Sequence, residues 1–582
     1  GGTHTFSSGL TVANGTVKVS SGTVTLGGTG SLPAVELTDG TLTVNGATTA
    51  QSFTMSAGVQ NGSSSLTVSG AMAWSGGTLR GSGSTAIASG GTLTTSGSAY
   101  KYLDGRTLSN SGTVTLGGTT EFRLMNAATI SNQSGGLFDA PADLDLDHYS
   151  GSVSTFTNAG TFRKSSGTAT TRVEAAFNNT GTLEVQSGTV RLAQGGTSSG
   201  QTTTVASGAI LDFQGGTHTF SAGLTVGDGT LKLTSGTVVL GGTGSLPAVE
   251  VVDGTLTVNG ATTVQMLTMS DSDGKQNGTS TLTVNGSMSW TGGILEGSGS
   301  TVIPSGVTLS ISSSSYKYID GRTLNNQGTV MQTGGYFYLR NAGAISNSGT
   351  YNIAGDYSIS DNGGAASTFT NTGTFKKTSG TLSNSVYVQF INNGGTIQVE
   401  AGTLRFHKSS SFNGGTYAVT SGATLAFYES GQVYTVSGTL LGTLNGTFML
   451  SNGTMTVASG GATFAMGGNG FRFERGTING SGTLTNTGTF RITGTGFKYL
   501  SGATLANQGT VTHTGGNFRL DNGGTINNSG TFDAAGDYSV SDNGGAAARQ
   551  FINTGTFKKT SGTLTGSVYV PGNGYPLEAE GV

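Results

Sequence analysis

The chain has 582 residues, 103 of them glycine, and only 9% of its residues are charged, with a formal net charge of −3. This length exceeds one ordinary hydrophobic core, so we expect several domains or a one-dimensional array. The lack of a basic stretch argues against nucleic-acid binding, the lack of cysteine excludes disulfides and thiolate chemistry, and no apolar run is long enough to insert in a membrane.

Short segments of alternating polarity recur from the N-terminal end onward. Thr23–Leu26, Thr41–Val44 and Thr255–Val258 each alternate threonine with apolar residues. Alternation with period two is typical of a β-strand with one buried face. Asn-Gly, Asp-Gly, Ser-Gly and Gly-Gly pairs separate the segments, as turn residues do. Because no segment keeps a 3.6-residue period, we expect an all-β protein with almost no helix.

One five-residue phrase, Asn-x-Gly-Thr-apolar, recurs along most of the chain in steps that are mostly 21 to 25 residues. A fixed period of this size indicates a solenoid with one structural unit per repeat. Hairpins would repeat at shorter spacing, whereas parallel strand pairing needs a dozen or more residues before the chain returns. We therefore predict a parallel β-helix with coils of about 21–25 residues, stacked about 4.8 Å apart. The phrase begins at Asn110, Asn158, Asn179, Asn326, Asn347, Asn371, Asn393, Asn486, Asn507, Asn528 and Asn553, with a degenerate copy at Asn132.

The phrase also predicts side-chain contacts between coils. Its glycine suits a turn that needs an unusual backbone conformation, and its apolar residue is expected to point inward. Asparagines at the same corner of successive coils can form a ladder of amide hydrogen bonds along the axis. We predict this structural ladder at Asn158, Asn179, Asn326, Asn347, Asn371, Asn393, Asn486, Asn507, Asn528 and Asn553.

The sequence also contains a repeat that is much longer than one coil. Gly1–Phe6 returns as Gly215–Phe220, and Tyr100–Arg106 returns as Tyr316–Arg322. A third copy is shorter by about 33 residues, or about one and a half coils, because its offset from the second copy is 181 instead of about 214. We divide the chain into super-repeats 1–214, 215–430 and 431–582, forming one continuous rod. The third has a divergent C-terminal end that contains Pro571 and Pro576.

The Asn-x-Gly-Thr-apolar coil, the absence of cysteine and the richness in threonine, serine and glycine resemble the repeat regions of large secreted bacterial proteins. Filamentous-haemagglutinin-type adhesins and autotransporter passenger domains are the most similar types. The resemblance covers nearly the whole chain and rests on repeat style. It implies a right-handed parallel β-helix and an extracellular, cell-surface role that is structural or adhesive. Because Gly1 begins in mid-repeat, we expect part of a longer fibre, or a subunit that self-associates end to end or laterally.

Catalysis is the main alternative class, since parallel β-helices also carry pectate-lyase and polygalacturonase chemistry. The five histidines, which include the repeated pair His4 and His218, form no recognisable acid/base constellation in the sequence. We therefore expect no catalytic residue, no cofactor and no enzyme, and keep a polysaccharide-binding or polysaccharide-cleaving protein as the alternative. Ice binding is less favoured, because charged residues such as Lys18 and Glu184 interrupt the Thr-x-Thr pattern.

Several aspartates are candidate Ca²⁺ ligands, because clustered oxygen ligands suit this ion. Asp143, Asp145 and Asp147 alternate along one segment, and the first of them recurs as Asp356 and Asp537. The alternative, which we favour, is that these residues build a polar turn.

Two further patterns recur in all three super-repeats. An aromatic-Lys-aromatic stretch stands at 100–102, 316–318 and 497–499, and a basic pair stands at 163–164, 376–377 and 558–559. Exposed groups of these types suit binding to a glycan, to another cell or to a neighbouring rod. The alternative, which we favour, is aromatic stacking along the coil with solvated lysines.

Overall fold

The computed structural model describes residues 1–545, 547–564, 566–570 and 577–579, so the divergent end with Pro571 and Pro576 lies outside the described residues. The described part consists of β-strands joined by turns, from β1 (Thr3–Phe6) to β71 (Leu577–Ala579). Within these ranges there is no helix, and hence none long and apolar enough to cross a membrane.

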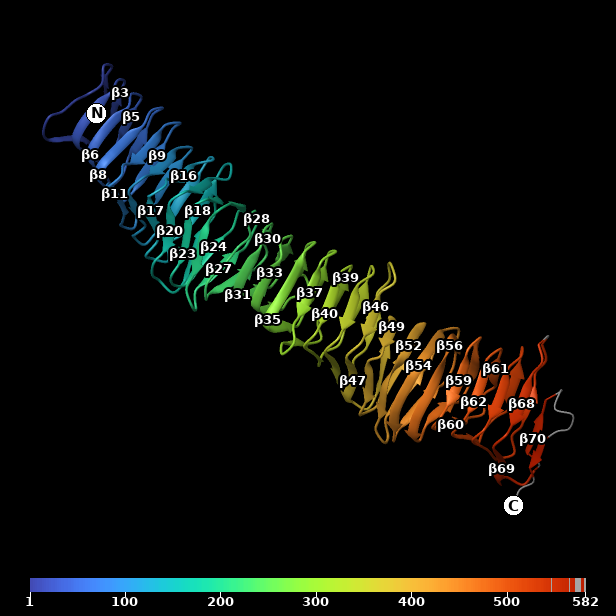
Figure 1. Ribbon diagram of the computed structural model, residues 1–582. Helices are drawn as coiled ribbons and strands as arrows, with labels where there is room; N and C mark the ends of the chain where they lie inside the picture. Colours follow the sequence, from blue (N-terminus) through green and yellow to red (C-terminus); the bar gives the residue numbers. More distant parts are fainter. Residues whose placement is uncertain (546, 565, 571–576, 580–582) are drawn as a thin grey trace. The chain divides into compact units, whose positions relative to one another are not determined.

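Two compact units make up the chain, Gly1–Leu282 and Thr283–Val582. Both are parallel β-solenoids, which have about 26 coils in total, and within each unit the coils follow one another in chain order (Figure 1). The predicted fold class is therefore confirmed. The super-repeat boundaries are a division by sequence similarity and stay a prediction.

A coil of the first unit contains three short strands. Each strand pairs in parallel with its counterpart one coil later, so that Tyr102 lies beside Arg123 and Leu108 beside Ile130. Residues one period apart in the sequence thus form columns that run from coil to coil. Two successive coils consist of β12 (Lys101–Asp104), β13 (Thr107–Asn110) and β14 (Thr113–Thr115), and of β15 (Phe122–Met125), β16 (Thr129–Asn132) and β17 (Leu137–Asp139).

The second unit repeats this design, and its three columns of strands are called faces A, B and C. Face A includes β39 (Lys317–Asp320), β42 (Phe337–Arg340), β45 (Ile359–Asp361), β48 (Ser383–Val386), β51 (Thr403–Phe406), β53 (Thr424–Phe427) and β60 (Thr489–Ile492). Face B includes β40 (Thr323–Asn326), β43 (Ala344–Asn347), β46 (Thr368–Asn371), β49 (Gln389–Asn393), β61 (Lys498–Ser501) and β64 (Phe518–Asp521). Face C includes β41 (Thr329–Gln332), β44 (Thr350–Ala354), β47 (Thr374–Ser379), β50 (Thr396–Val399), β59 (Thr483–Asn486), β62 (Thr504–Asn507), β65 (Thr525–Asn528) and β68 (Gln550–Asn553).

The shortened third super-repeat is turned around the solenoid by one face relative to the second. Strand β39 carries the sequence Lys-Tyr-Ile on face A, whereas its counterpart β61 carries Lys-Tyr-Leu on face B. The Asn-x-Gly-Thr phrase moves in the same sense, from face B at Asn326 to face C at Asn486. The missing stretch of about 33 residues is not a whole number of coils, so equivalent residues emerge on the next face.

Apolar residues of successive strands fill the interior. In the first unit Phe138, Phe156 and Phe162 are fully buried, and their ring centroids lie 5.1–6.0 Å apart. Edge-to-face and tilted contacts at this separation stabilise aromatic pairs beyond the area they bury. The interior is therefore a packed core, and every functional group must be sought on the outward faces or in the turns.

Candidate functional site

Buried asparagine ladders connect successive coils at three places. In each ladder the Nδ2 of one asparagine donates to the Oδ1 of the next, over 2.6–2.8 Å. The second amide hydrogen is used as well, as where Asn158 Nδ2 donates to the carbonyl of Thr182 at 2.9 Å. The ladders run through Asn110, Asn132, Asn158 and Asn179, through Asn326, Asn347, Asn371 and Asn392, and through Asn486, Asn507, Asn528 and Asn553.

Asn393 is a correction to the predicted ladder. Asn371 Nδ2 donates to Asn392 Oδ1 at 2.8 Å, and Asn392 is fully buried, whereas Asn393 is exposed. The turn here has two glycines, Gly394 and Gly395, and the residue paired with Asn371 is Asn392. One extra residue in the turn shifts the inward position back by one, and the phrase alone does not show this shift.

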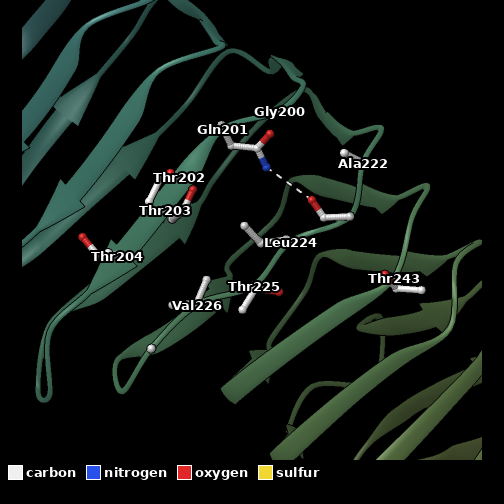
Figure 2. A pocket seen from close by; sticks show the side chains of 12 residues that line it. Gly200, Gln201, Thr202, Thr203, Thr204, Ala222, Leu224, Thr225, Val226 and Thr243 are labelled. Atoms are coloured by element: carbon white, nitrogen blue, oxygen red, sulfur yellow. Dashed lines mark hydrogen bonds between the residues drawn. The ribbon is translucent and has the colours of Figure 1, made fainter.

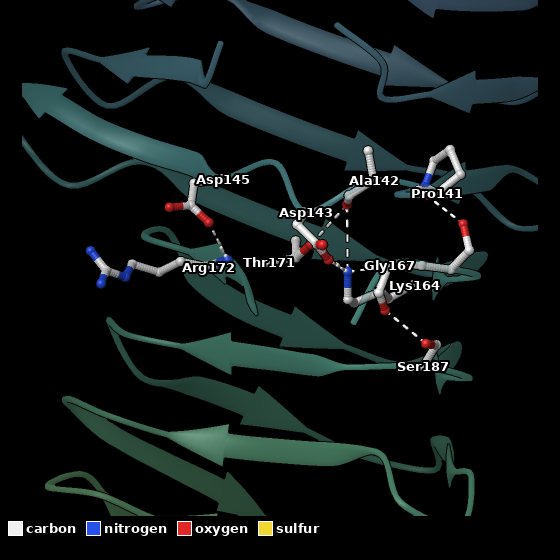
Figure 3. A network of polar contacts seen from close by, with 10 residues as sticks. Pro141, Ala142, Asp143, Asp145, Lys164, Gly167, Thr171, Arg172 and Ser187 are labelled. Atoms are coloured by element: carbon white, nitrogen blue, oxygen red, sulfur yellow. Dashed lines mark hydrogen bonds and ion pairs between the residues drawn. The ribbon is translucent and has the colours of Figure 1, made fainter. Parts of the chain in front are cut away.

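A buried lysine pairs with an aspartate one coil earlier in every super-repeat, which corrects the expectation of solvated lysines. The Nζ of Lys164 lies 2.6 Å from Asp143 Oδ1 and also donates to Ser166 O and Thr171 Oγ1 (Figure 3). The hydrogen bond from Lys164 lowers the pKa of Asp143 below its ordinary value. Lys377–Asp356 and Lys559–Asp537 repeat the pair at 3.1 and 2.9 Å, and all three lysine side chains are 0% exposed.

Each candidate Ca²⁺ ligand therefore has its own hydrogen-bond or ion-pair partner within the protein. Asp145 Oδ1 accepts the backbone N–H of Arg172 at 2.6 Å, and Asp147 lies 3.9 Å from the guanidinium of Arg123. In the described part of the chain, no three acidic, histidine or cysteine side chains converge as metal ligands. The Asp143–Lys164 pair and its copies instead hold a turn against the coil.

The lysines of the aromatic-Lys-aromatic stretches are buried too, which again differs from the solvated lysines expected. Lys498 Nζ donates to the carbonyls of Gly494, Gly496 and Gly515 at 2.9–3.0 Å, and Lys317 Nζ is held in the same way by carbonyls. Burial lowers the pKa of both lysines to about 8. These cations therefore cross-link coils inside the solenoid.

The arginine that follows the first such stretch is a larger internal cross-link. Arg106 is 1% exposed, and its guanidinium makes five hydrogen bonds of 2.6–3.2 Å. They go to the Thr85 hydroxyl and to backbone carbonyls of the two coils that precede Arg106 in the chain. The accepting carbonyls belong to Gly62, Ser64, Arg80 and Ser84.

Three clusters of aromatic side chains, one per super-repeat, lie on the outer surface of the coils. Cluster 1 consists of Tyr100, Tyr102, Tyr149 and Arg123, cluster 2 of Tyr316, Tyr318, Tyr336 and Tyr338, and cluster 3 of Phe497, Tyr499 and Arg519. In clusters 1 and 3 the guanidinium lies over an aromatic ring, 3.5 Å from the centroid of Tyr100 and 4.4 Å from that of Phe497. Such stacking leaves ring faces and hydroxyls at the surface.

Cluster 2 replaces the arginine by tyrosine. The three clusters share a Phe-x-Leu strand at Phe122, Phe337 and Phe518, in which x is Arg123, Tyr338 and Arg519. Tyr318 and Tyr338 stack with centroids 5.4 Å apart, and Tyr336, 52% exposed, lies 5.0 Å from Tyr316.

Tyr336 has a left-handed backbone, with φ of 53°. This conformation is costly for a bulky residue, and it is found mostly where a site requires it. An exposed aromatic ring held on strained backbone therefore marks cluster 2 as a candidate binding surface.

The surroundings of three histidines can be compared. His218 and His513 are buried, and desolvation lowers the pKa of each to about 4. His407 differs, because it contacts Ser385 and Glu429, which stand 22 residues before and after it. The sequence analysis missed this set, although its spacing of one coil on each side is the signal that would have found it.

A groove of about 490 Å³ opens in the first unit between Gly200–Thr204 and Ala222–Gly227 (Figure 2). It arises because the segment between β28 (Thr217–Phe220) and β29 (Thr230–Leu233) leaves the coil and is tied back by a bridge between Thr225 and Ser245. Threonines and a glutamine line it, with Gln201 Nε2 donating to Gly223 O at 3.3 Å. No acid or base lines the groove, so it offers hydrogen bonds without catalytic chemistry.

Comparison with known proteins adds no identity to these sites. No protein-family model matches the chain, and no curated protein sequence matches it.

Proposed function

We propose that this chain is a structural and adhesive β-solenoid of the bacterial cell exterior, which binds its partner through the three aromatic clusters. The observation that carries the proposal is the recurrence of an exposed aromatic cluster in every super-repeat, at Tyr100, Tyr316 and Phe497. Repetition of one surface on a single chain gives multivalent binding, which raises avidity without stronger individual contacts.

The use of the charged residues supports the same proposal. Many of the charged side chains bond one coil to the next. They are the recurrent lysines, Arg106 and the aspartates paired with Lys164, Lys377 and Lys559. These groups are typical of a scaffold built for length, in keeping with the resemblance to filamentous-haemagglutinin-type repeats. Clusters 2 and 3 lie on faces A and B, so partners are engaged on more than one side.

We infer that the partner is a glycan. Tyrosine rings combine an apolar face with a polar hydroxyl and suit a ligand that has both kinds of surface. The guanidinium of Arg340 lies 4.5 Å from the ring centroid of Tyr318, but it is paired with Asp320 at 2.8 Å, so its charge is already balanced within the protein. Lateral or end-to-end self-association into a fibre is the second candidate, and lateral contacts would use the same clusters.

Binding of the purified chain to a glycan array tests the proposal. The double variant Tyr316→Ala/Tyr336→Ala is expected to weaken binding roughly tenfold or more, since exposed tyrosines of this kind often dominate an interface. Tyr569→Ala is the matched control, because Tyr569 is 65% exposed and lies outside the clusters. Retained affinity in the double variant would contradict the role of cluster 2. Concentration-dependent assembly in sedimentation, lost in the same variant, would favour the fibre instead.

A further inference from the structure

Three side chains from three successive coils of face A form a hydrogen-bonded chain. Ser385 lies in β48, His407 directly follows β51, and Glu429 follows β53 by two residues. Ser385 Oγ is 3.0 Å from His407 Nε2, and His407 Nδ1 is 2.9 Å from Glu429 Oε2. Both distances are those of good hydrogen bonds.

This order of groups is that of a nucleophile, its base and the carboxylate that orients the base. A carboxylate can only accept, so His407 Nδ1–H donates to Glu429, and Nε2 is left to accept the Ser385 hydroxyl proton. The same constellation occurs on unrelated folds, including versions with glutamate, and is recognised by geometry and roles.

The surroundings hold the imidazole and the carboxylate in place. The His407 ring packs between Tyr387 and Tyr428, with centroids 4.5 and 5.2 Å away. The buried Tyr434 hydroxyl donates to Phe406 O at 2.8 Å and accepts the backbone N–H of Glu429 at 3.0 Å. The turn that carries Glu429 is thus tied to the strand that carries His407.

The solenoid does not need these residues for its coils. The matching coils of the first super-repeat, in strands β21 (Thr170–Val173), β24 (Thr189–Leu192) and β27 (Ile210–Phe213), carry Arg172, Ala193 and Gly215 at the three positions. Equivalent coils form without these three groups. The presence of all three side chains in the second super-repeat is therefore not explained by the fold and indicates a chemical role.

We propose that Ser385, His407 and Glu429 form the site of a serine esterase that hydrolyses short-chain O-acyl esters. Ser385 is only 7% exposed, so the nucleophile admits a small acyl group such as acetyl. Arg405, the register partner of Ser385 on the next coil, places its guanidinium over Tyr428, 4.2 Å from the ring centroid. Its Nε is buried and has no hydrogen-bond partner within the described residues, and we assign it to the oxyanion that develops beside Ser385.

The reaction follows from these roles. Ser385 Oγ attacks the ester carbonyl carbon while its proton passes to His407 Nε2, and the tetrahedral oxyanion forms beside Arg405. The C–O bond to the alcohol then breaks, and His407 returns the proton to the leaving oxygen. Water, deprotonated by His407, attacks the acyl-serine, and the acid leaves as Ser385 regains its proton. The sum is ester plus water giving acid plus alcohol.

The outward side chains of face A indicate which molecule carries the ester, that is, the alcohol part of the substrate. One outward column runs from Tyr318 to Tyr338 and Ser360, and the next strands of face A place Tyr387 and His407 further along it. A chain molecule bound at cluster 2 therefore extends toward Ser385. This part of the inference rests on the proposed glycan binding, and it makes the substrate an O-acylated polysaccharide.

The test uses the full chain with p-nitrophenyl acetate and a fluorophosphonate probe. We expect ester hydrolysis and covalent labelling of the peptide that contains Ser385. Ser385→Ala and His407→Gln are expected to lower kcat by several orders of magnitude, up to about 10⁶-fold, as removal of the nucleophile or the base does in a serine protease. Ser383→Ala, an exposed serine of the same strand, is the matched control and is expected to keep full activity.

Glu429 is a positioning residue, so its test needs a second readout. Glu429→Gln is expected to lower kcat with little change in KM for p-nitrophenyl acetate, because the imidazole loses the carboxylate that holds it with Nε2 toward Ser385. Glu429→Asp, which keeps a carboxylate, is expected to restore part of kcat. A loss that appears in KM alone, or that is equal in the two variants, would contradict the role of Glu429.

Acetate release from an acetylated polysaccharide separates the two levels of the inference. A higher KM for acetate release in Tyr316→Ala/Tyr336→Ala than in the parent chain, with an unchanged KM in Ser383→Ala, supports the polysaccharide substrate. Hydrolysis of the small ester without any release from the polymer overturns the polymer assignment alone. Hydrolysis that is equal in Ser385→Ala and in the parent chain, with no label on Ser385, overturns the esterase whatever the glycan array shows.

Discussion

Replacing Asn392 by alanine is expected to destabilise its coil by about 2–4 kcal/mol, the cost of leaving buried hydrogen-bonding groups unpaired. Asn392 Oδ1 accepts from Asn371, and its Nδ2 faces the carbonyls of Gly395 and Gly414 at 3.0 and 3.2 Å. Alanine removes both halves of this link, so Asn371 Nδ2 and the carbonyls of Gly395 and Gly414 lose a buried hydrogen-bond partner. Native-state hydrogen exchange of the coils between Thr368 and Tyr417 measures the effect, because a repeat array can open locally.

The neighbouring residue supplies the control. Asn393→Ala changes the same residue type one position along, but Asn393 is exposed and accepts only a surface hydrogen bond from Asn413 at 3.0 Å. Its effect is expected to stay within about 0.5 kcal/mol, as for most surface substitutions. Equal effects of the two substitutions would contradict the ladder through Asn392.

Arg106→Met is expected to cost about 3–5 kcal/mol in the first unit, because several buried acceptors lose their donor at about 1–3 kcal/mol each. Burial lowers the pKa of Arg106 only to about 10, so the side chain is a cation at neutral pH. Methionine keeps an unbranched chain but donates no hydrogen bond, and the four carbonyls and the Thr85 hydroxyl lose their donor. Hydrogen exchange in the segment from Gly62 to Arg106 is expected to accelerate.

Arg80→Met is the matched arginine control. The Arg80 side chain is exposed, and only its backbone carbonyl accepts from Arg106, so the substitution leaves that acceptor in place. A change within about 0.5 kcal/mol is expected. Similar exchange rates in the two variants would show that the buried guanidinium does not hold these coils.

The fold could be predicted from the sequence because one coil is one repeat. The 21 to 25 residue period demands parallel pairing, and strands such as Thr107–Asn110 and Thr129–Asn132 then align phrase against phrase. The same logic places most ladder asparagines. It fails at Asn393, because a two-glycine turn permits either of two adjacent asparagines to face inward, and only the register with Asn371 decides between them.

The buried cations could not be predicted from residue type. Lysine is rarely buried unless it is paired, so Lys164 and Lys498 read as surface residues. Yet Asp143 stands 21 residues before Lys164, and Asp356 stands 21 before Lys377. A search for complementary groups one coil apart would have found these pairs, and it would also have found Ser385, His407 and Glu429. The rotation of the third super-repeat follows from its length only once the number of strands per coil is known.

The central claim is that residues one coil apart lie side by side in columns, and a disulfide tests it most directly in this cysteine-free chain. Ser383 and Thr403 are register partners in the strands that also carry Ser385 and Arg405. In-register neighbours in a parallel sheet lie about 4.8 Å apart, within the range a disulfide spans. Under oxidation, Ser383→Cys/Thr403→Cys is expected to form an intramolecular disulfide, seen by peptide mapping without reductant. Ser383→Cys/Arg405→Cys, two residues out of register, is expected to stay reduced. A disulfide in the second pair and none in the first would contradict the columns and every site built on them.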